Sequence, residues 1–360
     1  MSATRLVGPV RIVGTGLIGT SIGLGLRARG IEVILDDASA ANVRLAADYG
    51  AGRLAQPGDE PTLIVVSVPP DAVADVVAAE LESYPKALVT DVASVKLAPL
   101  QSLRDRGADI SRYLGSHPLA GRERGGPSAG RADLFVGRPW VVAGHDAIGY
   151  REGAAVEDLI MDLGALPIEM DAAEHDEAVA LISHVPQLVS SLTAARLVDA
   201  QDAAVGLAGG GLRDVTRVAA SDPSLWQQIL GANAEPVVRI LQALRDDLDG
   251  LIAALSDLDA PGARRTVAEV LTAGNAGVAR IPGKHGSTSR FTTVTVLIDD
   301  RPGQLAALLA EIGELGVNLE DLRLEHSPGA ELGIVEVAVL PAVAAGLRDA
   351  LTERGWRIAG

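Results

Sequence analysis

Three glycines near the N-terminus constrain the fold more than any other feature of the chain. Gly14, Gly16 and Gly19 have the G-x-G-x-x-G spacing and follow a short apolar run, Val10–Val13. In a strand–turn–helix unit the first glycine allows a tight turn, the second lets the backbone approach a pyrophosphate, and the third lets helix and strand pack closely. We therefore predict a buried parallel strand, then a helix that stops at Gly30 and points its first N–H groups at the phosphates.

Two acids follow at the distance that a dinucleotide site requires. A second predicted strand, residues 32–35, ends in Asp36 and Asp37, and an acid about 20 residues after the glycines is expected to bind the ribose 2′-hydroxyl. A 2′-phosphate would face two carboxylates there with no arginine before Arg44, so the sequence favours NAD over NADP. The alternative is a glycine-rich turn that binds nothing. The other predicted cofactor contacts are Gly14, Gly16, Leu17, Ile18 and Gly19 in the turn, and Ser67 and Pro69 at the end of a later strand.

The composition limits the chemistry that the chain can use. At 360 residues it has room for two or three domains, and it contains no cysteine. Disulfides and thiolate metal sites are therefore excluded, no other metal-ligand spacing is present, and a cytoplasmic protein is expected. The formal charge of −16 disfavours nucleic acid and anionic membrane surfaces as partners, so an anionic substrate would need a local group of arginines.

The sequence contains no stretch typical of a signal peptide or a membrane span. Residues 1–9 lack the apolar core of a signal peptide, and no run of 18 residues is uninterruptedly apolar. The nearest candidate, residues 178–198, contains His184, Pro186 and Gln187, which favour a buried helix over a transmembrane one.

The pattern of apolar residues divides the chain into three domains and a linker. Strand and helix patterns alternate through residues 1–171, which predicts a Rossmann-type doubly wound α/β domain. Its further strands are expected at residues 62–68, 87–90, 140–143 and 166–170. Residues 172–280 are helical, a segment that often forms a shared dimer core after such a domain. Residues 281–289 form a linker, and residues 290–360 have a β-α-β-β-α pattern, a small ferredoxin-like α+β unit.

His117 is the predicted proton-transfer residue. It lies between a predicted strand end and a Pro-Leu-Ala-Gly turn, which places it rigidly at the edge where doubly wound sheets bind ligands. The ordinary pKa of a histidine suits proton transfer near neutral pH. The alternative is a structural histidine bonded to a backbone carbonyl. Ser94, at the same edge, could orient this imidazole, contact the nicotinamide amide, or only cap a helix.

Polar residues in the helical segment predict a substrate pocket. Pro186 lies inside a long apolar helix and should kink it, with His184 and Gln187 beside the kink. Arg217 could bind a carboxylate through its fork of donors, and Arg213, four residues earlier, is the weaker candidate. The alternatives are a satisfied polar pair within a helical bundle and a surface charge. His175, which has an acid on each side, is expected only to begin its helix.

Five motifs together resemble the prephenate/arogenate dehydrogenase family of tyrosine biosynthesis. They span residues 10–279 and are highly specific as a set. They are Gly14-Thr-Gly-Leu-Ile-Gly19, Asp91-Val-Ala-Ser-Val-Lys96, His117-Pro-Leu-Ala-Gly121, Ser183-His-Val-Pro-Gln187, and Gly209-Gly-Gly-Leu-Arg-Asp-Val-Thr-Arg217 with Ser221-Asp-Pro223. The resemblance implies that a hydride passes from the ring carbon bearing the hydroxyl to NAD⁺, a histidine accepts the hydroxyl proton, and the ring carboxylate leaves as CO₂. No mutase segment precedes the sheet, as in monofunctional members.

The same resemblance implies roles for individual residues. His117 becomes the base with Ser94 in support, Arg217 binds the substrate carboxylate, and Asp37 rather than Asp36 is the ribose acid. The pocket is completed by His184, Gln187 and Glu123. Some relatives carry a second histidine at the position of Gln187, so its contact is the least transferable of the set.

The C-terminal unit resembles an ACT domain. Asp300, Gly303 and Asn318 lie at the expected loop and helix positions and are the predicted effector contacts. ACT domains commonly bind amino acids between paired copies, so the resemblance implies tyrosine feedback in a homodimer or higher homo-oligomer. The alternative is a purely structural dimerisation unit.

Three other functions compete with an NAD-dependent prephenate dehydrogenase. Arogenate dehydrogenase differs only in the side chain of its substrate, and a carboxylate facing the substrate ammonium would favour it. A hydroxyacid dehydrogenase of similar architecture would typically use a lysine in the helical domain, and residues 172–280 contain none. A non-catalytic amino-acid sensor built on the C-terminal unit would bind tyrosine without turnover.

Overall fold

The computed structural model describes residues 4–122, 125–148, 150–281, 291–326 and 332–359. These residues form two units, one of residues 1–199 with 216–243 and one of residues 200–215 with 244–360, and each is described by itself. The predicted domain bounds at 171, 280 and 289 stay a prediction, and all but the first residue of the predicted linker lie outside the described ranges.

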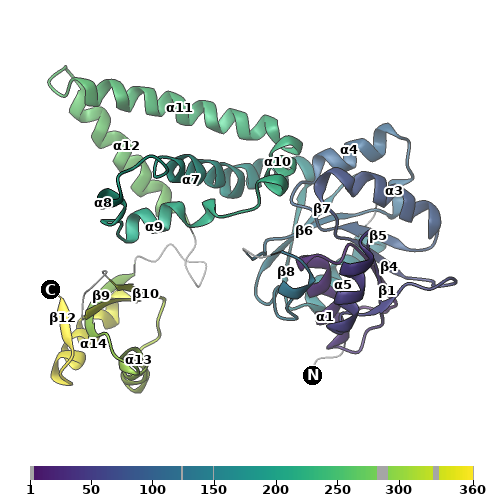
Figure 1. Cartoon of the computed structure of the whole chain (residues 1–360), viewed down its shortest axis with the longest axis horizontal. Helices are drawn as coiled ribbons and strands as arrows, with labels where there is room; N and C mark the ends of the chain where they lie inside the picture. Colours follow the sequence, from purple (N-terminus) through teal and green to yellow (C-terminus); the bar gives the residue numbers. More distant parts are fainter. Residues whose placement is uncertain (1–3, 123–124, 149, 282–290, 327–331, 360) are drawn as a thin grey trace. The chain divides into compact units, whose positions relative to one another are not determined.

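A five-stranded parallel sheet is the centre of the N-terminal domain (Figure 1). The strands are β1 (Val10–Val13), β2 (Val33–Asp36), β3 (Arg53–Leu54), β4 (Leu63–Val66) and β5 (Leu88–Asp91), in the order β3-β2-β1-β4-β5. The predicted apolar runs are these strands, and only the two-residue β3 was not predicted. The strand order reverses at β1, so the glycine turn after β1 lies at the switch point where such sheets bind ligands.

Helices cover both faces of this sheet. They are α1 (Leu17–Arg27), α2 (Ala40–Asp48), α3 (Val73–Ser83), α4 (Leu97–Asp105) and α5 (Tyr150–Asp162). Alternate strand residues point to opposite faces, so Ile12 packs in one apolar cluster with side chains of α1, α2 and α5. Val66 packs in a second cluster with side chains of α3 and α4. The sheet is therefore held rigidly between two apolar layers, with its polar residues left at the strand ends.

A smaller sheet carries His117. Its strands are β6 (Gly115–Pro118), β7 (Pro139–Gly144) and β8 (Leu166–Asp171), with β6 antiparallel and β8 parallel to β7. The expectation that residues 166–170 form the last strand of the main sheet was wrong, because β6, β7 and β8 form a separate sheet, which contacts β5 through an isolated backbone bridge between Val89 and Tyr113. Beyond that bridge the Ser116 hydroxyl donates to the carbonyl of Asp91 at 2.9 Å. The carbonyl of Asp91 therefore accepts a side-chain donor, and the backbone pairing between β5 and β6 does not continue past this point.

The apolar helix that follows is interrupted as predicted. It consists of α6 (Ala172–Val179), a π-helical turn (Ala180–His184) and α7 (Val185–Ala195). Pro186 is the second residue of α7, so its missing N–H frees a carbonyl one turn earlier and the wide π turn absorbs the mismatch. The whole stretch is long and apolar enough to cross a membrane by length and composition. Within this fold, however, it carries buried polar residues, among them His175, His184 and Gln187.

Shorter helices follow. They are α8 (Asp202–Val205), α9 (Gly210–Thr216), a 3₁₀ turn (Arg217–Ala219), α10 (Pro223–Ala232), α11 (Ala234–Ser256) and α12 (Ala263–Val278). Arg213 lies in α9, which ends at Thr216, and Arg217 begins the 3₁₀ turn. Several large apolar side chains of α7 and its neighbours remain exposed, including Leu192 at 62% and Val198 at 80%.

The C-terminal unit has one strand more than predicted. Its elements are β9 (Thr292–Asp299), α13 (Gln304–Glu314), β10 (Asp321–His326), β11 (Leu332–Val339), α14 (Pro341–Glu353) and β12 (Arg357–Ala359). The three-residue β12 pairs with β9 and gives the antiparallel order β10-β11-β9-β12 of a ferredoxin-like fold. The sequence also predicts a turn at residues 327–329, between the second and third strands of this unit, and it lies outside the described residues.

Candidate active site

The glycine turn has the geometry of a dinucleotide site. Gly14 has φ +98°, and a Cβ there would lie 2.2 Å from the carbonyl oxygen of Ser67. A Cβ on Gly19 would lie 2.0 Å from the oxygen of Gly14, so helix and strand pack too closely for any side chain. A Cβ on Gly16 would meet nothing within 4 Å. Gly14 and Gly19 are thus needed for close packing, while Gly16 leaves open space at the start of α1, as a pyrophosphate requires.

The two acids after β2 have different environments. Asp36 is held by Arg11, whose Nη2 donates to it at 2.5 Å. Asp37 instead bends back to the glycine turn, where its Oδ2 accepts from the Thr15 N–H at 2.6 Å and the Thr15 hydroxyl at 2.8 Å. Of the two, Asp37 therefore lies beside the turn, which supports the choice of Asp37 for the ribose.

A cavity of about 850 Å³ connects the glycine turn with the helical residues. Its lining includes most of the predicted site: Gly16, Leu17, Ile18, Ser67, Pro69, Ser94, His117, His184, Gln187 and Arg217. Residues not predicted also line it, among them Arg122, Asp222 and Trp226. Glu123 lies outside the described residues, so its contact with the pocket stays a prediction.

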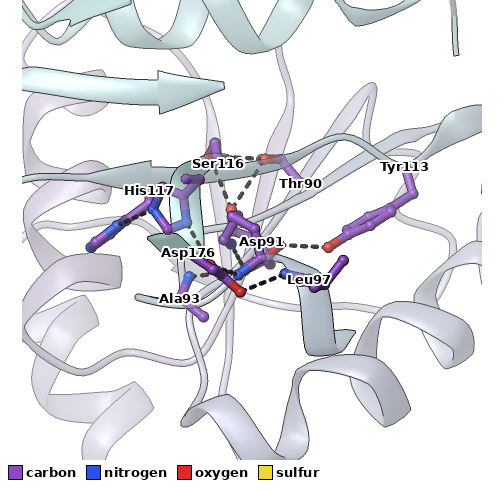
Figure 2. A network of polar contacts seen from close by, with 10 residues as sticks. Thr90, Asp91, Ala93, Leu97, Tyr113, Ser116, His117 and Asp176 are labelled. Carbon is purple, nitrogen blue, oxygen red and sulfur yellow. Dashed lines mark hydrogen bonds and ion pairs between the residues drawn. The ribbon is translucent and has the colours of Figure 1, made fainter. Parts of the chain in front are cut away.

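His117 is held by a second histidine. It lies half-buried in β6 at the cavity wall, and its Nδ1 is 2.8 Å from Nε2 of His175. The Nδ1 of His175 is in turn 2.7 Å from Oδ1 of Asp176, and both residues are buried (Figure 2). His175 was expected only to begin its helix, and that expectation was wrong: α6 begins at Ala172, and its first turn turns His175 inward toward β6.

Ser94 does not orient the imidazole in the described structure. It lines the cavity, but the hydrogen bond to His117 comes from α6 rather than from the loop after β5. The role that remains for Ser94 is a contact with cofactor or substrate, which stays a prediction.

Asp176 joins the helical segment to the sheet domain. Its Oδ1 accepts the backbone N–H of Lys96 at 2.8 Å and its Oδ2 accepts that of Leu97 at 2.9 Å, at the start of α4. A carboxylate at a helix N-terminus is stabilised by the free N–H groups and the helix dipole. The carbonyl of Asp176 also accepts from Nδ2 of Asn233, which lies 3.1 Å from Nδ1 of His184.

A second polar cluster lies beneath the histidines. Lys96 is fully buried and its Nζ forms an ion pair with Asp91 at the end of β5. The Tyr113 hydroxyl donates to Oδ2 of Asp91 at 2.7 Å, and the N–H of Ala93 donates at 2.9 Å to Oδ1, the oxygen that Lys96 contacts (Figure 2). The Asp91-Val-Ala-Ser-Val-Lys96 motif therefore closes on itself as an internal salt bridge.

The surroundings favour neutral histidines. Burial is the main cause that lowers the pKa of His117 well below 6.5, with His175, Lys96 and His184 adding to it. Burial also lowers the pKa of His184 to about 4. At neutral pH the His117 imidazole is thus ready to accept a proton.

The remaining predicted residues occupy the helical wall and the C-terminal unit. Gln187 donates to the Ser221 hydroxyl at 2.7 Å, and Arg217 is exposed at the cavity. In the C-terminal unit, Asp300 and Gly303 lie in the loop between β9 and α13, where Gly303 has φ +90° and precedes the helix. Asn318 lies in the loop after α13. Among the described residues, no group of three or more His, Cys, Asp or Glu side chains could hold a metal ion.

Sequence comparison agrees with this arrangement. The family models described as "Prephenate dehydrogenase, nucleotide-binding domain" and "Prephenate dehydrogenase, dimerization domain" match residues 22–168 and 171–269. The chain is 37% identical over 358 residues to a Streptomyces niveus protein described as "Probable prephenate dehydrogenase NovF", over 96% of this chain and 98% of the relative. The chain belongs to the prephenate dehydrogenase family. It is therefore an NAD-dependent oxidoreductase.

Solved structures of the family share the fold of this enzyme. A Synechocystis arogenate dehydrogenase is 27% identical with a TM-score of 0.62, over 74% of this chain and 99% of that one. A prephenate dehydrogenase from A. aeolicus, solved with hydroxyphenyl propionate and NAD⁺, is 23% identical with a TM-score of 0.66, over 77% of this chain and 100% of that one.

Sequence reasoning missed the residues that contact His117 and its histidine partner. His175 and Asp176 come from α6, and Asn233 follows α10. They contact His117 in β6, the start of α4 and one another across long separations in the sequence, which no local motif marks. The available signal was the Glu174-His175-Asp176 run itself, since a helix start needs only one of those acids as a cap. The structure gives that duty to Asp171, whose Oδ1 accepts from the N–H of Glu174. His175 and Asp176 were therefore free for another role.

Proposed function

We propose that the enzyme is an NAD-dependent prephenate dehydrogenase, which converts prephenate by oxidative decarboxylation to 4-hydroxyphenylpyruvate. The observation that carries this proposal is a single cavity lined by the glycine turn, by His117 and by Arg217. The open Gly16, the close-packed Gly14 and Gly19, and Asp37 beside the turn fit a dinucleotide with an unphosphorylated ribose.

The chain supplies a base and a carboxylate site. When bound, NAD⁺ accepts the hydride from the ring carbon that carries the substrate hydroxyl. His117 takes the hydroxyl proton, and its lowered pKa keeps it in the accepting form at neutral pH. Arg217 binds a substrate carboxylate, which gives a dianionic substrate a local cation in a chain of charge −16. His184 and Gln187 line the wall between them.

Arogenate remains a competing substrate because of one acidic residue. Among the described residues that line the cavity, Asp222 is the only acid, beside Ser221 and Gln187. One of its oxygens caps α10 by accepting from the N–H of Ser224 at 2.9 Å, so the other could face a substrate ammonium. Turnover of the two substrates at equal concentration decides between them, and Asp222→Asn should reduce only the activity with arogenate.

The family model and the surface support assembly and regulation. The matched dimerisation domain and the exposed Leu192 and Val198 support a homodimer, in which α7 and its neighbours bury their apolar side chains. The ferredoxin-like order of the C-terminal sheet supports an ACT domain that binds tyrosine near Asp300, Gly303 and Asn318. Inhibition of turnover by tyrosine tests this.

The replacement His117→Asn tests the function. NADH formation, followed by absorbance with prephenate, should fall by about two to four orders of magnitude, because the base is lost. NAD⁺ binding, measured by titration without substrate, should stay unchanged. His145→Asn is the matched control, since His145 lies outside the cavity lining and bonds the Tyr113 carbonyl. Full turnover in His117→Asn would remove His117 from the role of base.

A further inference from the structure

The hydrogen bonds of Asp176 fix where the protons of the two histidines lie. Both carboxylate oxygens accept backbone N–H groups, from Lys96 and Leu97, and a carboxylate can only accept. The contact at 2.7 Å between Oδ1 and Nδ1 of His175 therefore requires a proton on that nitrogen. In a neutral His175, Nε2 is then the acceptor.

The same logic extends to the base. Since Nε2 of His175 accepts, Nδ1 of His117 at 2.8 Å must be the donor. The proton of a neutral His117 is thus on Nδ1, and its Nε2 carries the lone pair. Nε2 is the only ring nitrogen of His117 left for the cavity, so the chain presents the substrate with an unprotonated nitrogen in one defined orientation.

The buried charges around the pair do not balance. The titratable and charged groups that face it are Asp91 from β5, Lys96 before α4, Tyr113 before β6, His184 from the π turn, and Asp176. Lys96 and Asp91 compensate each other, and burial raises the pKa of Tyr113 so that it stays neutral. The carboxylate of Asp176 accepts N–H groups of Lys96 and Leu97 and interacts with the Lys96 charge over a longer distance, but the side chain that contacts it directly is a histidine, which is a cation only when protonated.

We propose that His175 and Asp176 act as positioning residues that hold the positive charge produced when His117 accepts the substrate proton, which rests on His117 being the base. The substrate O–H bond breaks and an Nε2–H bond forms on His117, while the hydride leaves with its electron pair to NAD⁺. The Nδ1 proton of His117 moves toward Nε2 of His175, and Asp176 balances the resulting imidazolium. No other reactant is needed.

The replacement His175→Gln distinguishes holding the positive charge of His117 from merely keeping its ring in place. A glutamine carbonyl can still accept the Nδ1 proton of His117 and keep the ring in place, but it cannot share the charge. We expect kcat to fall roughly 10- to 1,000-fold, with KM for prephenate and Kd for NAD⁺ within about twofold. The acid limb of kcat/KM should also shift along the pH axis, because the imidazole of His175 no longer influences the pKa of His117. His145→Gln is the matched control and should change none of these.

A second measurement needs no turnover. Nitrogen NMR of the cofactor-free enzyme labelled with ¹⁵N-histidine should show neutral His117 as the Nδ1–H tautomer, with the signal identified by its loss in His117→Asn. An Nε2–H tautomer would overturn the proposal, and so would wild-type kcat and pH profile in His175→Gln. If His175→Gln behaves as wild type while His117→Asn is inactive, His117 keeps its role as the base, but His175 and Asp176 do not hold its charge. If His117→Asn is itself active, the proposed base has failed instead.

Discussion

Two buried polar clusters lie side by side in this enzyme and do different work. In the first, Lys96, Asp91 and Tyr113 pair with one another and are closed off from solvent. In the second, Asp176, His175 and His117 form a line that ends at the cavity. The first pairs one lysine with one aspartate, whereas the aspartate of the second has a histidine as its side-chain partner, which carries a charge only when protonated. Burial of polar side chains alone therefore does not mark a functional site. A polar cluster that reaches a cavity and contains a carboxylate without a permanent cationic partner is a better indicator.

The largest effect on stability should come from breaking the closed cluster. Lys96→Met leaves the buried Asp91 carboxylate without its cation, and removal of one partner of a buried ion pair costs about 3–5 kcal/mol. Urea denaturation followed by circular dichroism should show this loss. Arg131→Met, which removes an exposed pair with Asp133, is the control and should leave the midpoint unchanged.

The double variant Lys96→Met with Asp91→Leu sharpens the comparison. It removes both charges, so part of the loss in Lys96→Met should be recovered, although Tyr113 and Ala93 lose their acceptor. A double variant less stable than Lys96→Met would mean that Asp91 supports the fold through its hydrogen bonds rather than through the ion pair.

A smaller effect is expected at the edge of the closed cluster. Tyr113→Phe removes one donor to Asp91 but leaves the lysine and the N–H of Ala93 in place. A lost hydrogen bond to a buried charged group should cost about 1–2 kcal/mol, measured by the same denaturation. Turnover at saturating substrate should remain near that of the wild type. A loss of kcat with unchanged stability would show that the closed cluster also serves the chemistry.

The comparison also explains which parts could be read from the sequence. The main strands and the glycine turn follow from apolar runs and local spacing, which depend only on neighbours along the chain. The residues around the cavity were found where a motif marks them, as for His117 and Arg217. The support of His117 could not be predicted, because it depends on how α6 docks on the start of α4. Likewise β12, only three residues long, is a strand because it pairs with β9 rather than through any pattern of its own.

The smallest predicted change, and the most specific to the open cluster, is in the pH dependence. The proposed reaction needs neutral His117, and burial lowers its pKa below the ordinary 6.5. The value of kcat/KM should therefore stay constant as pH falls through 6.5 and then decrease about tenfold per unit below the lowered pKa. His184, with a pKa of about 4, is the other cavity histidine whose protonation this acid limb can report. Activity regained on return to neutral pH excludes acid unfolding as the cause. An acid limb at or above 6.5 would mean that the cavity does not disfavour the imidazolium, and that Asp176 already holds the proton there before substrate binds.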